Sequence, residues 1–172
     1  SADPVVVATA LLRGAFEYQG QKCSAASRAY IPSNTAGQIK QLLIDGVQSF
    51  RIGSVEDFGN FINAVIDEKS FDKIKSYIDN AKKDPKADIW VGGKCDKKNG
   101  YFIQPTVIEA KNPKYITMCE EIFGPVLTVY VYPAGNFEKA LELVDSTSPY
   151  ALTGSVISQD RAAVELATAK LR

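Results

Sequence analysis

The sequence has no histidine, and it has only three cysteines, Cys23, Cys95 and Cys119. A thiol here therefore has no imidazole to activate it, and a zinc site would need cysteine and carboxylate ligands gathered from distant positions. The cysteines show no CxxC or other short metal-binding spacing, and their odd number argues against a disulfide framework. A reducing, intracellular compartment is the simplest account of these thiols.

An excess of charge of one sign and a long apolar run are also missing. Lysine plus arginine and aspartate plus glutamate number 20 each, so the net charge of zero does not indicate a nucleic acid or an anionic membrane as partner. No apolar stretch approaches the roughly 20 residues of a membrane-spanning helix. The first residues, SADPVVVATALLRG, lack the charged region and cleavage pattern of a secretory signal. We therefore expect no nucleic acid and no membrane as partner.

An initiator methionine is lacking as well, since Met118 is the single methionine. The last predicted helix reaches Leu171 without a C-cap glycine or a following loop. Both features lead us to expect a piece of a longer protein. The length of 172 residues nevertheless suffices for one domain with its own core.

Helical and strand-like runs alternate along the chain. Apolar residues recur at helical spacing after Pro4, and Ser33 is a candidate N-cap for the second helix. The expected helices cover about 4–18, 33–50, 67–84, 136–146 and 160–171. The expected extended segments cover 28–32, 87–94, 100–110, 124–133 and 152–158. The continuous apolar run at 124–133 predicts a strand buried on both faces, and the mixed charges at 69–86 predict a solvated helix face. This alternation predicts an α/β fold with a largely parallel sheet flanked by helices.

Cys23 lies in the stretch EYQGQKCSAASR, directly after the first predicted helix. Gly20 permits a sharp turn there, and the positive charge of Lys22 favours the thiolate form of a nearby cysteine. The end of a helix contributes nothing to such activation, because its dipole is negative there. Local chemistry thus leaves two interpretations open, a reactive thiol or a small buried apolar residue.

Two longer stretches carry a family resemblance. FEYQGQKCSAASR resembles the active-site stretch of the aldehyde dehydrogenase superfamily, and EEIFGPVLTVYVY resembles its second conserved stretch, in the same order and at the same separation. GYFIQPTVI and YALTGSVIS fit the same pattern, so the resemblance covers essentially the whole chain. Within the superfamily, the cysteine stretch is most similar to the Δ1-pyrroline-5-carboxylate dehydrogenases, which oxidise glutamate γ-semialdehyde to glutamate with NAD in proline catabolism.

The resemblance implies a role for four residues. Cys23 would attack the aldehyde as a thiolate, and its backbone N–H would contribute to an oxyanion hole. The base in this family is a glutamate acting through water, which explains how the thiol works without histidine. Glu121 would bind the nicotinamide ribose of NAD, Phe123 would flank the nicotinamide, and Ser24 would bind the α-carboxylate of the substrate. From sequence alone, Phe123 also fits the core, Glu121 a surface carboxylate or a partner of a helix N-cap, and Ser24 a turn hydroxyl.

The same resemblance implies that residues 1–172 form the nucleophile-bearing catalytic domain. The dinucleotide-binding domain, the general base and the oxyanion asparagine would then lie outside this chain. The full-length parent would act on a small-molecule aldehyde, would form a homo-oligomer, and would work in the mitochondrial matrix or the bacterial cytoplasm. Two alternatives remain: an aldehyde dehydrogenase for another aldehyde, or a catalytically silent module that supports oligomer contacts. Cys95 and Cys119 match no catalytic position and are interpreted as packing residues.

Overall fold

A mixed β-sheet forms the middle layer of the computed structural model, which describes residues 2–171. Within these residues, four strands pair in the order β1-β6-β5-β2. They are β1 (Arg28–Pro32), β2 (Ala87–Val91), β5 (Thr106–Ala110) and β6 (Val126–Tyr132). β1, β6 and β5 run parallel, whereas β2 is antiparallel to β5. The expectation of an α/β fold with a largely parallel sheet is confirmed.

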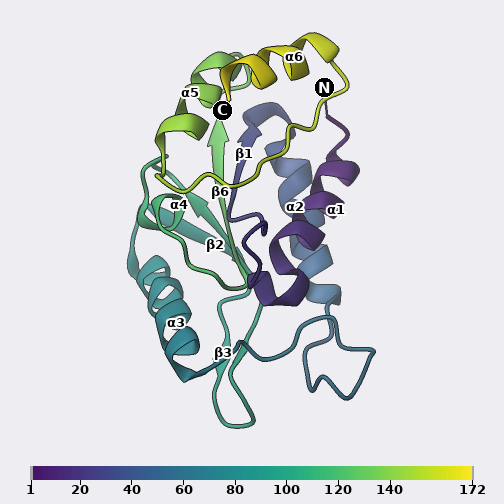
Figure 1. Cartoon of the computed structure of the whole chain (residues 1–172), viewed down its shortest axis with the longest axis vertical. Helices are drawn as coiled ribbons and strands as arrows, with labels where there is room; N and C mark the ends of the chain where they lie inside the picture. Colours follow the sequence, from purple (N-terminus) through teal and green to yellow (C-terminus); the bar gives the residue numbers. More distant parts are fainter. Residues whose placement is uncertain (1, 172) are drawn as a thin grey trace.

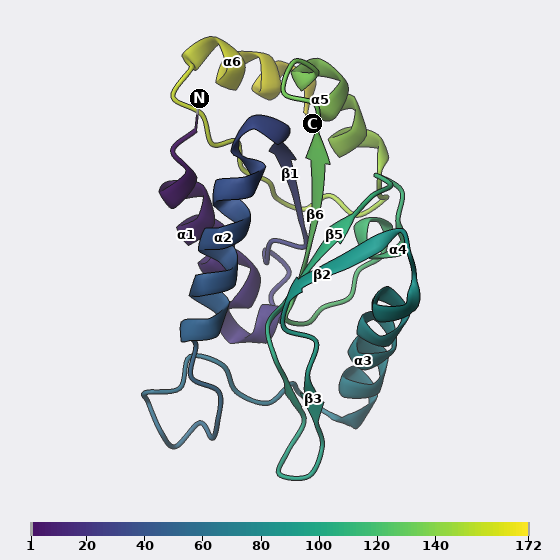
Figure 2. The same cartoon turned by 180° about the vertical axis from the view of Figure 1, so that it is seen from behind.

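Helices cover both faces of this sheet (Figure 1). α1 and α2 lie on one face and α3 on the other, while α5 and α6 lie beyond the carboxyl end of β6 (Figure 2). The helices are α1 (Pro4–Phe16), α2 (Ser33–Ser49), α3 (Glu68–Lys83), α4 (Ile116–Cys119), α5 (Phe137–Ser146) and α6 (Arg161–Lys170). A tight turn at Glu17–Gly20 with non-helical backbone angles follows α1, and the short strands β3 (Cys95–Asp96) and β4 (Phe102–Ile103) form a separate hairpin.

Two apolar cores, one on each face of the sheet, explain the continuous apolar run of β6. Side chains alternate between faces along a strand, so a strand covered on both sides is apolar throughout. Leu127 and Val129 belong to the core under α1 and α2, whereas Val126 belongs to the core under α3. Their burial fixes β6 in the middle of the molecule.

Local capping sets where the helices begin. The carboxylate of Asp3 accepts a hydrogen bond from the N–H of Val5 at 2.8 Å, and Pro4 occupies the first turn of α1. Asp67 caps α3 in the same way, through the N–H of Ser70 at 2.7 Å. The prediction that Ser33 caps α2 is wrong: Pro32 holds the N-cap position, and the Ser33 hydroxyl instead accepts a hydrogen bond from the N–H of Ala134 at 3.2 Å.

The expected strand at 152–158 does not form. This segment is neither helix nor strand, and Leu152 within it is 71% exposed. An alternating apolar pattern becomes a strand only where a neighbouring strand supplies hydrogen-bond partners. Among residues 2–171 no strand pairs with the segment, although β1 lies at the edge of the sheet. No helix in the same range is long and apolar enough to cross a membrane.

Candidate active site

The cysteine stretch and the EEIFGPVLTVYVY stretch meet at the amino ends of two neighbouring strands. The cysteine turn, residues 21–27, leads into β1, and the loop of residues 120–125 leads into β6. Because β1 and β6 are parallel neighbours, both segments lie at the amino ends of the strands. Two hydrogen bonds join them to the sheet, from the N–H of Thr128 to the carbonyl of Ser27 at 3.0 Å and from the N–H of Thr106 to that of Pro125 at 2.9 Å.

The backbone before the cysteine turn is left-handed at three consecutive residues. Tyr18, Gln19 and Gly20 have φ values of 51°, 60° and 67°, so α1 ends at Phe16, two residues earlier than predicted. Gly20 also touches the second stretch: a Cβ atom at this position would lie 2.2 Å from the carbonyl oxygen of Gly124. Only glycine fits both the positive φ and this approach of two backbones.

Two glutamine side chains fix the cysteine turn by hydrogen bonds to the backbone of residues 63–66. The side chain of Gln19 accepts a hydrogen bond from the N–H of Asn63 at 3.1 Å and donates to the carbonyl of Ala64 at 3.5 Å. The side chain of Gln21 accepts from the N–H of Ile66 at 2.8 Å. The contacts of Gln19 help to hold the left-handed backbone at Tyr18 and Gln19, a conformation that is costly for residues other than glycine. Neither glutamine was predictable as a support from the sequence, since neither follows a periodic pattern.

Cys23 is an exposed free thiol beside a hollow that Glu121 and Phe123 also line. Ser24 is exposed next to Cys23 but does not line the hollow. Among the described residues, neither the backbone N–H of Cys23 nor the hydroxyl of Ser24 has a hydrogen-bond partner. The structure thus brings together three of the four predicted site residues, whereas Ser24 does not line the hollow.

Lys22 does not stand free beside the thiol. Its ammonium lies 3.4 Å from the carboxylate of Glu17, which also pairs with Arg13, and 5.6 Å from the ring centroid of Tyr18. Two backbone hydrogen bonds shape the turn itself, from the N–H of Ala25 to the carbonyl of Lys22 and from the N–H of Ala26 to that of Gly14. The position of the thiol therefore depends on the backbone of the turn, and Glu17 partly neutralises the nearest cation.

The carboxylate of Glu121 makes no hydrogen bond or ion pair within residues 2–171, whereas its backbone carbonyl accepts one from Lys73 at 2.8 Å. The neighbouring Glu120 carboxylate accepts a hydrogen bond from the Tyr77 hydroxyl, and this bond raises the pKa of Tyr77 to about 12. Phe123 has a left-handed φ of 59° and is 42% exposed. The loop therefore presents a free carboxylate and a bare aromatic ring to the hollow.

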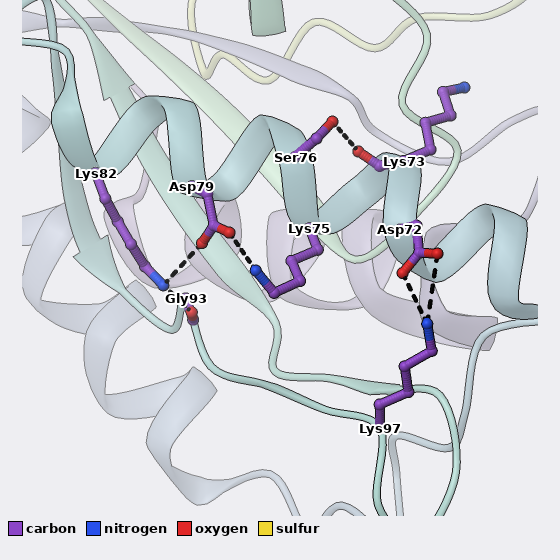
Figure 3. Close-up of polar contacts among 8 residues, drawn as sticks. All are labelled: Asp72, Lys73, Lys75, Ser76, Asp79, Lys82, Gly93 and Lys97. Carbon is purple, nitrogen blue, oxygen red and sulfur yellow. Dashed lines mark hydrogen bonds and ion pairs between the residues drawn. The ribbon is translucent and has the colours of Figure 1, made fainter.

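α3 carries the charged run that the sequence reasoning interpreted as a solvated face. Figure 3 shows Asp79 between Lys75 and Lys82, with Lys82 also donating to the carbonyl of Gly93 at 2.6 Å. The ammonium of Lys73 points away from this group (Figure 3). α3 thus connects on one side to the segment before the β3–β4 hairpin and on the other to the loop of Glu121.

The other two cysteines lie away from the hollow. Cys95 is partly buried against the core under α3, and burial raises the pKa of its thiol. Cys119 is partly buried at the end of α4, where its carbonyl accepts a hydrogen bond from Ser148 at 2.6 Å. Neither thiol lines the hollow beside Cys23.

Comparison with known proteins decides the family. The profile of the aldehyde dehydrogenase family matches residues 1–172. The chain belongs to the aldehyde dehydrogenase family. Its resemblance to pyrroline-carboxylate enzymes is also confirmed. This aldehyde dehydrogenase chain is 59% identical over 156 residues to Delta-1-pyrroline-5-carboxylate dehydrogenase, mitochondrial, of Dictyostelium discoideum, covering 91% of the chain and 28% of that protein.

The human protein of the same name is 50% identical over 173 residues, covering 100% of the chain and 31% of that protein. Among solved structures, the Delta-pyrroline-5-carboxylate dehydrogenase of Mycobacterium tuberculosis superposes with a TM-score of 0.91 at 42% identity, over 99% of this chain and 30% of that one. A second structure of that enzyme is bound with NAD and has a TM-score of 0.90. This aldehyde dehydrogenase chain therefore spans less than a third of the length of these relatives.

Proposed function

We propose that the chain is the nucleophile-bearing catalytic part of an enzyme that oxidises L-glutamate γ-semialdehyde to L-glutamate with NAD, a step of proline catabolism. The main support is the meeting of Cys23, Glu121 and Phe123 at one hollow, although the two stretches are far apart in the sequence. The substrate class rests on the relatives, which are named as pyrroline-carboxylate dehydrogenases.

Cys23 is the nucleophile in this proposal. Its thiolate adds to the aldehyde carbon and gives a thiohemiacetal, whose oxyanion accepts a hydrogen bond from the unpaired backbone N–H of Cys23. Loss of a hydride from that carbon leaves a thioester on the sulfur. Water then attacks the thioester, releasing the carboxylate product and the thiol. The base that activates the water would be a glutamate from a segment outside this chain, as the family resemblance implies.

NAD would supply the hydride acceptor, and the residues at the hollow suit its nicotinamide half. The unpaired carboxylate of Glu121 is a strong acceptor for the two hydroxyls of a ribose. The 42% exposed ring of Phe123 offers a flat apolar surface to an aromatic ring. One of the related structures is bound with NAD. Glu121 and Phe123 would therefore orient the cofactor, whose main binding domain would lie outside this chain.

Ser24 is proposed to select the substrate. Its hydroxyl is exposed and unpaired next to Cys23, so it is free to donate to a carboxylate on an aldehyde bound at the thiol. Glutamate γ-semialdehyde has such a carboxylate, whereas a simple aliphatic aldehyde does not. Other aldehydes remain the alternative.

The setting of the parent enzyme is also part of the proposal. Residues 1–172 would form the catalytic domain, and the parent would be a homo-oligomer. The curated relatives from Dictyostelium and human carry the word mitochondrial in their names, and a bacterial relative has the same fold. We therefore keep both the mitochondrial matrix and the bacterial cytoplasm as compartments of the parent.

Substitutions in the full-length parent test the reaction. Cys23→Ala is expected to abolish NAD reduction with glutamate γ-semialdehyde, because the covalent intermediate cannot form. Cys95→Ala serves as the matched control and is expected to keep the activity, since that thiol lies away from the hollow. Substantial turnover by the Cys23 variant would contradict the mechanism.

Ser24→Ala tests the substrate. It is expected to raise the KM for the semialdehyde with little change in kcat, because a lost hydrogen bond to a charged group costs roughly 1.5–3 kcal/mol. Propanal, which lacks the carboxylate, is expected to show the same KM with both enzymes. An unchanged KM for the semialdehyde would instead favour a different aldehyde. The 172-residue chain alone is expected to reduce no NAD, and turnover by it would contradict an incomplete active site.

A further inference from the structure

One face of α3 supports the loop that carries Glu121 and Phe123. The ammonium of Lys73 donates to the carbonyl of Glu121 at 2.8 Å, and the hydroxyl of Tyr77 donates to the carboxylate of Glu120. Ile74, between them on the helix, packs so closely that a Cβ atom at Gly124 would lie 2.4 Å from its Cδ1 atom. Positions 73, 74 and 77 share one face of a helix, so α3 contacts the loop as a single surface.

The direction of the two adjacent glutamates depends on this surface. Glu120 has an extended backbone, with φ −101° and ψ 152°, and successive side chains of an extended segment point to opposite sides. When Tyr77 holds the carboxylate of Glu120 toward α3, the carboxylate of Glu121 is directed away from α3. The loop then continues to Phe123, whose left-handed φ of 59° requires support from its surroundings.

We propose that Tyr77 is a positioning residue for the nicotinamide half of the cofactor, acting through Glu120. Both glutamates line the hollow, but the hydrogen bond from Tyr77 engages the carboxylate of Glu120 and leaves that of Glu121 free for the ribose. Lys73 holds the backbone carbonyl of Glu121 itself. This inference rests on the proposed function, because it assumes that Glu121 and Phe123 contact NAD. Tyr77 itself touches neither cofactor nor substrate, and its effect is expected on cofactor binding, not on the reacting thiol.

The test uses the full-length parent with Tyr77→Phe, which removes only the hydroxyl. The dissociation constant and the KM for NAD are expected to rise about fivefold, less than for a direct hydrogen bond to the cofactor, because the lost bond acts only through the position of the loop. The KM for the aldehyde is expected to stay within twofold. Ser76→Ala is the matched control, because it also removes a hydroxyl from α3, one that donates only to the carbonyl of Lys73 in the same helix (Figure 3).

Glu120 variants test the mechanism of the effect. Glu120→Ala is expected to raise the same constants as Tyr77→Phe, and the double variant is expected to add little more, because both changes remove one bond. Glu120→Gln keeps an acceptor oxygen and is expected to lie between the parent and Glu120→Ala. If Tyr77→Phe fails to fold, Glu120→Ala removes the same bond from an exposed side chain.

AMP separates positioning from a general structural defect. AMP carries the adenosine half of NAD alone, so its inhibition constant is expected to be the same in the parent, Tyr77→Phe and Glu120→Ala. Equal weakening of AMP and NAD, additive single effects or unchanged NAD constants would each overturn the inference and leave the proposed function intact. A parent that oxidises no aldehyde with NAD would instead overturn the proposed function.

Discussion

Replacing Gly20 with alanine disturbs the contact that joins the two conserved stretches. The new Cβ atom would lie 2.2 Å from the carbonyl oxygen and 2.7 Å from the carbonyl carbon of Gly124, and 2.9 Å from the carbonyl oxygen of Ala15. All three neighbours are backbone atoms, so no side chain can rotate to make room. The φ of 67° at Gly20 adds the cost of a left-handed conformation for alanine.

The steric overlap and the left-handed backbone together set the expected loss in the free energy of unfolding. Overpacking of this kind costs about 1–3 kcal/mol, and the left-handed conformation costs alanine about 1–2 kcal/mol. We therefore expect the free energy of unfolding to fall by about 2–5 kcal/mol, a large part of the ~5–15 kcal/mol of an ordinary domain. For a chain of this length that is a fall in Tm of about 10 °C.

Gly37→Ala is the matched control for the same chemical change. Gly37 lies inside α2, and a Cβ atom there meets nothing within 4 Å. Alanine is expected to stabilise the helix by about 0.5–1 kcal/mol, because it loses less conformational freedom on folding than glycine. Chemical denaturation of the chain, followed by circular dichroism, measures both variants. Equal stability of Gly20→Ala and the unaltered chain would refute the close approach of the two stretches.

Two further outcomes are expected for the chain. Iodoacetamide in limiting amount should label Cys23 first, because it is exposed whereas Cys95 and Cys119 are partly buried; mass-spectrometric mapping that finds either of the latter first would contradict this. The hydrogen bond from Lys75 lowers the pKa of Asp79, so the stabilisation is present above the ordinary pKa of 3.8 and is lost as the pH falls through the lowered folded value. Because this side chain is 34% exposed, Asp79→Asn is expected to reduce the free energy of unfolding by about 0.5 kcal/mol at pH 7, and by less near pH 3 in the same denaturation assay.

Periodicity and capping predicted much of the fold, because they depend on residues close in sequence. The apolar run of β6 indicated a strand buried on both faces, and Leu127 and Val126 indeed face different cores. The charged run of α3 indicated a solvated helix face, which the exposed ion pairs of Lys75 and Lys82 with Asp79 bear out. These features need no knowledge of which distant segments meet.

Features that depend on distant contacts were not predictable in the same way. The left-handed turn at Tyr18 and Gln19 is held by hydrogen bonds to Asn63 and Ala64, and no local sequence pattern predicts such partners. The segment 152–158 has the composition of a strand but no strand beside it. The resemblance to a family supplied what local physics did not, namely that Cys23 and Glu121 share a site.

The contact between Gly20 and Gly124 links that site to the fold. The cysteine turn and the loop of residues 120–125 each lead into the amino end of a parallel strand, so the pairing of β1 with β6 sets their separation. Gln19 fixes the first segment from one side, and Tyr77 fixes the second from the other. The thiol of Cys23 and the carboxylate of Glu121 thus lie on two segments with separate supports, and the backbones of these segments touch at Gly20 and Gly124. A change in the support by Gln19 should therefore move the thiol relative to the loop of residues 120–125, which would lower the rate of reaction without removing any group that touches the substrate. A change in the support by Tyr77 is instead expected to weaken cofactor binding.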